Sequence, residues 1–203
     1  TFADCDDRDC QRSTLVTVCG APPVTTVTVY DVQNVNSPNH PEENGTGEPR
    51  DYKKGRFIIE EAVVTSPTFQ TSGHPSFFVA DPTATAEPWK GVFVFAQNLT
   101  DVNVAPGDRV RLRGVYTEYF GATEVIPHRV EKLGTGTAPA PAAVTVDDIR
   151  TGAETAEQWE GVLVEVENVE VSETGVLTGG SGAGNNDFKV RHYGGSADMI
   201  VGR

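Results

Sequence analysis

Cysteine, methionine and basic residues are scarce in this chain of 203 residues. All three cysteines lie within the first 19 residues, methionine occurs once, and 16 lysines and arginines stand against 29 aspartates and glutamates. The net charge of -13 excludes a protein that coats nucleic acid non-specifically, because such proteins neutralise phosphates with clustered cations. The sequence also lacks a run of about 18 apolar residues, so we expect no membrane-spanning helix.

Residues 1–23 form a separate segment that holds every cysteine. An exported chain meets an oxidising environment, so two of the cysteines are expected to pair with each other and the third to pair outside this fragment. A zinc site is disfavoured, because no histidine lies nearby to complete four ligands. Since the chain begins with Thr1, we expect it to be a segment of a longer product. The disulfide candidates are Cys5, Cys10 and Cys19.

Aspartates surround two of these cysteines in the sequence DCDDRDC. Several carboxylates this close together are able to meet one hard cation such as Ca²⁺. The stretch is similar to the ends of Asp-rich calcium repeats of secreted bacterial surface proteins, although the Asp-x-Asp-x-Asp-Gly run that precedes such an end is missing here. A solvated acidic tail is the alternative interpretation. The candidate calcium ligands are Asp4, Asp6, Asp7 and Asp9.

From Val24 onward the sequence predicts an all-β protein. Apolar and polar residues alternate with period two, and Gly, Pro, Asn and Asp interrupt the runs. In the segment GDRVRLRG the alternation places Val110 and Leu112 inward and the three neighbouring arginines, at positions 109, 111 and 113, outward. The predicted strands are Val24–Val32, Gly55–Phe69, Ser76–Ala80, Gly91–Gln97, Asp108–Phe120 and Thr123–Leu133.

A Pro- and Ala-rich connector, residues 135–143, divides the β-rich part into two units. After it, VTVYDVQ of the first unit (residues 24–134) is answered by VTVDDIR, and GRFIIEEAVVTS by EGVLVEVENVEVS. Two copies of one unit are the economical interpretation. The second unit, residues 144–203, matches only the first three strands of the first, so we expect it to be truncated and to leave an unpaired edge. Either the natural protein continues or another chain supplies the missing strands.

The first unit resembles a known family in the segments VTVYDVQ with NSPNHP, FFVAD and GDRVRLRGVYTEYFGATEV. These segments are similar to the OB-fold domains of secreted bacterial nucleases and of exported bacterial surface proteins or lipoproteins. The resemblance implies a five-stranded Greek-key (OB-like) β-barrel, followed here by a second, incomplete OB-like unit. It also implies an accessory role, because nuclease activity in that family belongs to a separate catalytic domain.

No catalytic motif accompanies the predicted strands. The sequence holds no HExxH, GxSxG or P-loop pattern, and three of its four histidines adjoin proline in loop-like sequence. We therefore predict a protein that is not an enzyme: an extracellular or cell-surface structural module whose partners are itself or other surface proteins. This hypothesis extends to self-association into filaments, in which one chain adds a strand to the sheet of the next; Ser13–Val18 is a candidate donor strand.

An accessory nucleic-acid-binding domain of a secreted nuclease is the alternative function. Residues 51–140 hold 9 basic and 10 acidic side chains, whereas residues 1–50 hold 3 and 8 and residues 141–203 hold 4 and 11. The first unit is therefore close to neutral. Carbohydrate binding through Trp89 or Trp159 is a third hypothesis. The candidate nucleic-acid contacts are a basic stripe and two tyrosines: Arg109, Arg111, Arg113, Tyr116 and Tyr119.

Overall fold

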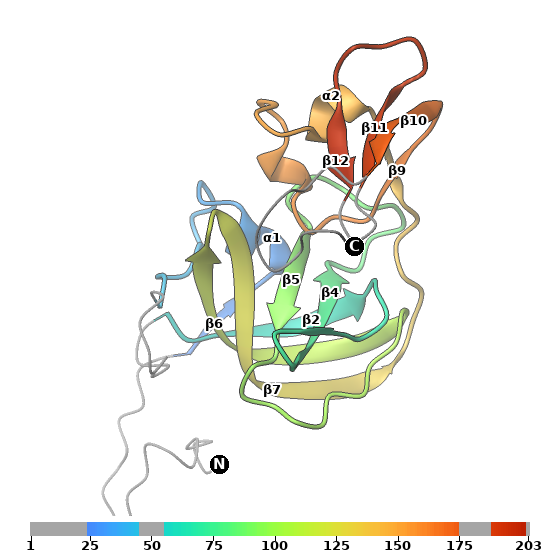
Figure 1. The fold of residues 1–203 in the computed structure, drawn as a ribbon. Coiled ribbons are helices and arrows are strands. Elements are labelled where there is room, and N and C mark those ends of the chain that lie inside the picture. Colours follow the sequence, from blue (N-terminus) through green and yellow to red (C-terminus); the bar gives the residue numbers. More distant parts are fainter. Residues whose placement is uncertain (1–23, 45–54, 175–187, 202–203) are drawn as a thin grey trace, which may run out of the picture.

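The computed structural model describes residues 24–44, 55–174 and 188–201, and within them the chain is mostly β (Figure 1). Its α-helices are short: α1 covers Val29–Gln33 and α2 covers Val146–Ile149. No helix of this part of the chain is long and apolar enough to cross a membrane. The predicted calcium ligands, disulfide candidates and donor strand all fall in residues 1–23, outside the described residues.

A large sheet organises the first unit in the order β1-β2-β6-β7-β5-β4-β3. Strand β2 also pairs with β4, and β5 runs parallel to β7, whereas the neighbours β2–β6, β6–β7 and β4–β5 are antiparallel. These strands confirm an all-β architecture. Strands β4 to β7 agree with four predicted runs to within two residues, whereas the predicted run Gly55–Phe69 ends five residues beyond β2. The bounds are β1 Thr25–Val27, β2 Phe57–Val64, β3 Phe69–Thr71, β4 His74–Ala80, β5 Gly91–Phe95, β6 Asp108–Tyr119 and β7 Ala122–Thr135.

Alternation along the strands builds the main core. Val110 and Leu112 of β6 are completely buried, as predicted, and pack with Phe57 and Ile59 of β2 and Phe77 of β4. The arginines that alternate with Val110 and Leu112 along β6 are only partly buried and face outward. Apolar burial of this kind stabilises by roughly 25 cal/mol for each Å² removed from water, so the two faces of β6 have different roles.

The register of β6 with β7 shifts by one residue at Gly114. A Cβ atom at this position would lie 2.9 Å from the Cα of Pro127, so only glycine permits the close approach. The extra residue of this shift lies on β7, so alternation on β6 continues: Tyr116 joins Val110 and Leu112 in the main cluster, whereas Val115 packs with Ile126 and Phe95 in a second one.

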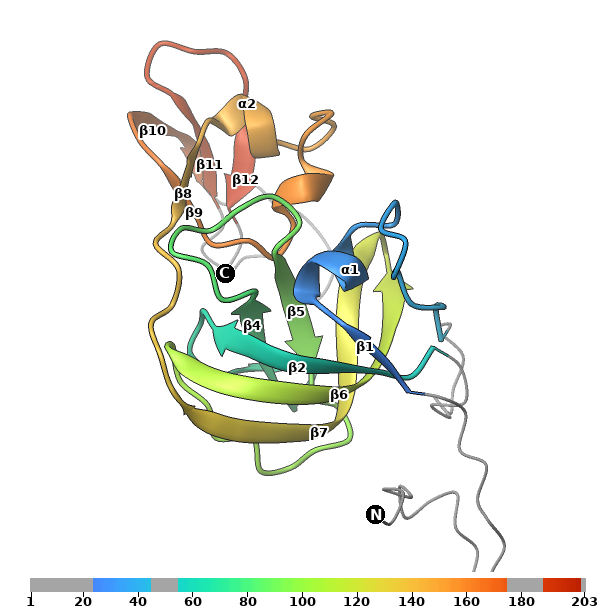
Figure 2. The same cartoon turned by 180° about the vertical axis from the view of Figure 1, so that it is seen from behind.

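The predicted strand Val24–Val32 is wrong in its second half, because the chain turns into helix α1 after β1 (Figure 2). Thr28 caps the helix: its hydroxyl oxygen accepts the Asp31 N–H at 3.1 Å, and the Asp31 carboxylate accepts the Thr28 N–H at 2.9 Å. Such a reciprocal cap satisfies backbone donors that a helix start leaves unpaired. This cap outweighs the period-two pattern of the sequence, so the segment forms a helix.

A buried carboxylate holds α1 against the sheet. Asp81, just after β4, accepts the N–H groups of Val29 and Tyr30 at 2.9 and 3.0 Å. Burial raises the pKa of Asp81, although these two hydrogen bonds act in the opposite direction. The helix start is thus tied to a strand more than 50 residues away.

The same local arrangement occurs after the connector. Strand β8 (Ala142–Val144) runs parallel to β9 (Val164–Val166), as β1 does to β2. Between them Thr145 begins α2, and its N–H and hydroxyl both donate to the Asp148 carboxylate. A second core forms around Trp159 and Leu163 and includes Ala86 from the first unit.

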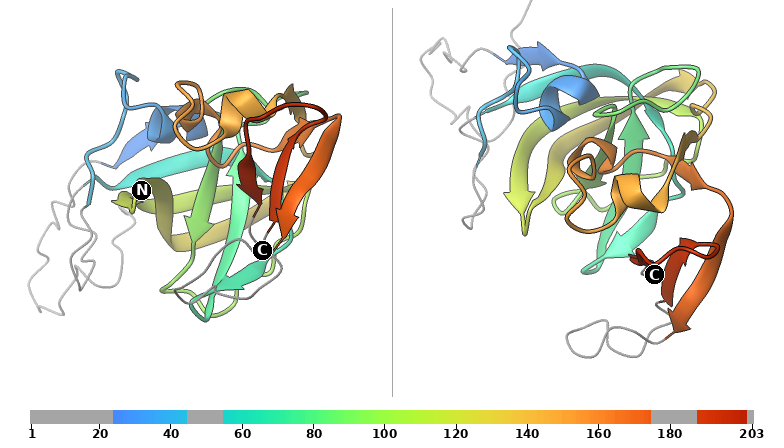
Figure 3. Two further views of the ribbon diagram at one scale, coloured as in Figure 1. Left: turned by 45° about the horizontal axis from the view of Figure 1, so that its top comes forward. Right: turned by 90° about the horizontal axis from the view of Figure 1, so that it is seen from above.

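A small antiparallel sheet completes the described part of the second unit: β10 (Val169–Thr174), β11 (Phe188–His192) and β12 (Met199–Val201). Asn168, with φ of 55°, lies between β9 and β10. The view from above in Figure 3 shows these three strands apart from α1 and from the β6–β7 hairpin.

Replacing Thr28 with alanine tests the cap of α1. We expect the free energy of unfolding to fall by about 1 kcal/mol, the usual effect of losing an N-cap, when urea denaturation is followed by circular dichroism. Thr26→Ala, at an exposed position of β1, is the matched control and should change it by less than about 0.5 kcal/mol. Equal losses in the two variants would contradict the role of the cap.

Candidate interaction surfaces

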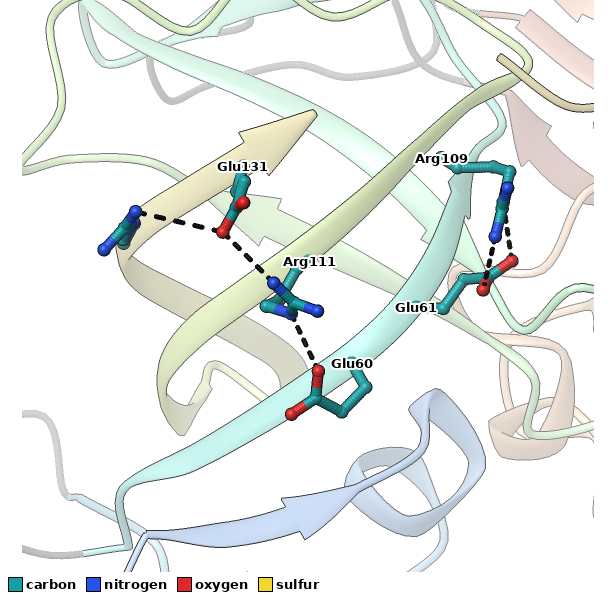
Figure 4. Close-up of polar contacts among 6 residues, drawn as sticks. Glu60, Glu61, Arg109, Arg111 and Glu131 are labelled. Atoms are coloured by element: carbon teal, nitrogen blue, oxygen red, sulfur yellow. Dashed lines mark hydrogen bonds and ion pairs between the residues drawn. The ribbon is translucent and has the colours of Figure 1, made fainter. Parts of the chain in front are cut away.

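Two of the three arginines in the predicted basic stripe, Arg109 and Arg111, form cross-strand ion pairs (Figure 4). Arg109 of β6 binds Glu61 of β2 through two hydrogen bonds of 2.7 Å. Arg111 binds Glu60 at 2.7 Å and Glu131 of β7 at 3.3 Å. Sequence reasoning found the arginines but missed their partners, which lie on the neighbouring strands.

These pairs change what the stripe offers to a ligand. The hydrogen bonds from Arg109 lower the pKa of Glu61, so its carboxylate stays charged. Glu60 raises the pKa of Arg111 in the same way, and Arg129 adds a 3.9 Å contact to Glu131. A phosphate that approached Arg109 or Arg111 would have to compete with a bound carboxylate.

The two predicted tyrosines have different environments. Tyr116 is 5% exposed, and its hydroxyl is hydrogen-bonded to His40 Nε2 at 2.8 Å. Burial, followed by the charges of Glu43 and Glu118, raises the pKa of Tyr116 to about 12. Its ring is therefore part of the core and offers no open face to a base. Tyr119, near the tip of the β6–β7 hairpin, is 47% exposed.

A row of phenylalanines covers the outer face of β3, β4 and β5. Phe78 and Phe93 are cross-strand partners with ring centroids 5.3 Å apart, and Phe69 lies 5.9 Å from Phe78. Phe95 continues the row 6.4 Å from Phe93. Phe69 is 40% exposed and the other three are partly buried. The alternation VFVF, residues 92–95, places its two phenylalanines on one face and was the signal for this row.

An uncharged cleft of about 380 Å³ adjoins this row where the two units meet. Its walls come from the end of β2, from β4, and from the segment before β9. It contains hydroxyl, aromatic and aliphatic groups but no titratable side chain. The lining residues are Thr65, Ser66, Phe78, Gly161, Val162, Leu163 and Val164.

One face of the β10–β11–β12 sheet carries apolar residues that are exposed on β10, whereas Val190 of β11 is only 7% exposed. Val171, Val190 and Met199 are paired across the three strands and so share this face. Val171 is 59% exposed and Val169 38%. The opposite face carries charges that are already paired, in Glu170–Arg191 at 2.8 Å and Glu173–Lys189 at 2.7 Å. We call the first surface the apolar face of the second unit.

The two units meet through backbone contacts beside both tryptophans. The Trp89 N–H donates to the Gln158 carbonyl at 2.7 Å, and Trp159 packs in the second core. A Cβ atom at Gly91 would lie 2.6 Å from the Cα of Val162, so the junction requires glycine there. Both tryptophans thus belong to the junction, which leaves the phenylalanine row as the more open aromatic surface.

A titratable carboxyl lies in the same junction. Glu160 accepts the Thr123 N–H of β7 at 2.7 Å, and its carbonyl accepts the Gln33 side chain at 3.4 Å. Burial, reinforced by the negative charges of Glu157 and Glu118, raises the pKa of Glu160 to about 7. The contact between the units therefore depends on a group that titrates near neutral pH.

Within residues 24–44, 55–174 and 188–201 the structure contains no cluster of three or more His, Cys, Asp or Glu side chains placed to hold a metal ion. No protein-family model matches the chain, and no curated protein matches it. The relationship to OB-fold domains accordingly stays a prediction.

Glu160→Gln tests the junction. Because the pKa of Glu160 is raised from 4.5 to about 7, the folded state holds this proton more tightly than the unfolded state. Its stabilisation is fully present below pH 4.5 and lost as the pH rises through 7. We expect the wild-type free energy of unfolding to fall by about 1–2 kcal/mol over this range, a value reduced for partial exposure, and the variant to lack this fall. Glu154→Gln, at an exposed position, should retain it; an equal fall in the Glu160 variant would refute the assignment.

Proposed function

We propose that the protein is a non-catalytic, exported structural module made of OB-like β-units that associates with further copies of itself. The observation that carries this proposal is the apolar face of the second unit, where Val169 and Val171 are exposed. The matching segment of the first unit ends with Val63 and Val64 of β2, and the side chains of these two valines are at most 3% exposed. Apolar surface of this kind favours a partner that covers it.

The strand pairings support the OB-like part of the proposal. The pairs β2–β6, β6–β7, β7–β5, β5–β4 and β4–β2 form a ring of five strands, with β5–β7 parallel. This order is what a five-stranded Greek-key barrel requires. The Thr-capped helix after β8, which repeats the one after β1, supports a second unit of the same kind.

The second unit corresponds to only part of that ring. Its described strands β10, β11 and β12 are successive antiparallel neighbours, as β2, β4 and β5 are in the first unit. The counterparts of β6 and β7 would cover the apolar face. A strand from another copy is able to take their place by pairing with an outer strand and burying Val171. Two unlike contact surfaces on one chain lead to open chains or filaments unless the rotation closes.

Export and calcium binding rest on the N-terminal sequence alone. The cysteines favour an oxidising compartment, and the aspartates Asp4, Asp6, Asp7 and Asp9 favour Ca²⁺. We therefore place the protein outside the cell or at its surface, with further copies or other surface proteins as its partners.

Val171→Lys tests self-association. The variant places a charge on the apolar face, so we expect the dissociation constant of the assembly to rise at least tenfold in sedimentation velocity experiments over a concentration series. Val35→Lys is the matched control, because Val35 is 66% exposed in the first unit and the charge change is the same. A wild-type chain that stays monomeric at every concentration would refute the proposal.

Nucleic-acid binding is the second candidate function, and the phenylalanine row is the observation that favours it. Bases stack on exposed aromatic rings with little sequence preference. The ion pairs of Arg109 and Arg111 weigh against it, because they already occupy the cations that phosphates would need.

Phe93→Leu distinguishes stacking from mere apolar packing. If the row binds single-stranded DNA, the variant should bind an oligothymidylate more weakly by about 1–3 kcal/mol, the usual value of one stacked base, in fluorescence anisotropy at low salt. Replacement of Arg109, Arg111 and Arg113 by alanine should weaken binding further and reduce its dependence on salt. Absence of binding by the wild-type protein at low salt would end this candidate.

A further inference from the structure

The tip of the β6–β7 hairpin holds a phenylalanine in a backbone conformation that phenylalanine rarely adopts. Phe120 has φ of 52° and Gly121 has φ of 80°, as the two central residues of a type I′ turn require. Asn-Gly is the preferred pair for this turn, because asparagine tolerates the left-handed region far better than a bulky side chain. Phe120 is therefore unfavourable for the local structure.

Burial within the chain does not offset this cost. Phe120 is 95% exposed, and its ring contact is with Tyr119, which is itself 47% exposed, at a centroid distance of 4.7 Å. A strained, exposed aromatic residue gains little from folding of its own chain. Its role is then in a contact with another molecule.

The charges beside the tip restrict the partner. Glu118 lies on the same hairpin, and its N–H donates to the Glu43 carboxylate at 3.1 Å. Carboxylates at these positions repel phosphates of nucleic acids and anionic lipids. The tip therefore suits an apolar, uncharged site.

The chain itself carries such a site in the cleft beside Phe78 and Leu163. The cleft measures about 380 Å³ and has no titratable side chain, and a dry cavity of about 150 Å³ already binds benzene. Phe78 and the adjoining Phe69 offer rings for edge or offset contacts. Because Phe120 is 95% exposed, it does not occupy the cleft of its own chain.

We propose that the Tyr119–Phe120 tip of one copy binds in the cleft of a second copy. This inference rests on the proposed self-association and adds a second contact surface to the apolar face of the second unit. The tip and the cleft are different patches, so the contact joins unlike surfaces.

Phe120→Asn in the full chain tests this contact. Asparagine suits the turn, so the midpoint of urea unfolding should stay the same or rise, whereas the dissociation constant measured by sedimentation velocity should rise at least tenfold. Thr65→Arg, which fills the cleft from its rim, should have the same effect, and the double variant should show no further loss because both changes remove one contact. Tyr193→Asn is the control, since Tyr193 is 82% exposed elsewhere.

The outcomes separate this contact from self-association in general. If Phe120→Asn leaves association unchanged while Val171→Lys weakens it, the tip–cleft contact is wrong and the proposed function stands. If Phe120→Asn lowers the unfolding midpoint without affecting association, the residue has a structural role and the contact is likewise wrong. A wild-type chain that never associates overturns both.

Discussion

The close approach of β6 to β7 at Gly114 is the constraint on which the first unit depends. Before it, β6 pairs with β2 and aligns Arg109 and Arg111 with their carboxylate partners. After it, the strand continues only with β7, draws Tyr116 into the core and carries the hairpin tip out to solvent. A side chain at position 114 would collide with the backbone of β7. The absence of a Cβ atom at this position therefore permits the close pairing of β6 with β7.

Sequence patterns predicted the strands well and the side-chain partners poorly. Period-two alternation is a local property, and it placed Val110 and Leu112 inward without knowledge of the other strands. The helix at Val29–Gln33 was missed because a Thr-x-x-Asp cap outweighs the alternation that surrounds it. The carboxylates opposite Arg109 and Arg111 were missed for another reason: Glu61 and Glu60 are separated from them by 48 and 51 residues, and only the register of β2 against β6 brings them together. The phenylalanine row likewise could not be predicted from one strand, because its rings come from β3, β4 and β5.

Charge is distributed unevenly, and the structure gives this a physical meaning. In the first unit acids and bases are nearly equal in number, and several are bound to each other across strands. The excess negative charge lies toward the two ends of the sequence. Pairs on the surface contribute little to stability, but they remove free cations from the face that would otherwise attract phosphate. Among the described residues, the surfaces that remain as candidate contacts are apolar: the phenylalanine row, the cleft, the hairpin tip and the apolar face of the second unit.

The glycine contact between the units has a geometric consequence. Gly91 and the segment at Gly161–Val162 approach so closely that neither glycine tolerates a side chain without a shift of backbone. Contacts between backbones have far fewer alternative arrangements than contacts between long side chains. Where copies meet through patches on different units, the angle between successive copies is then inherited from this junction. The pitch and curvature of such an assembly would therefore depend on the absence of a Cβ atom at Gly91 and Gly161. A larger residue at either position would alter the shape of the assembly before it altered the affinity between copies.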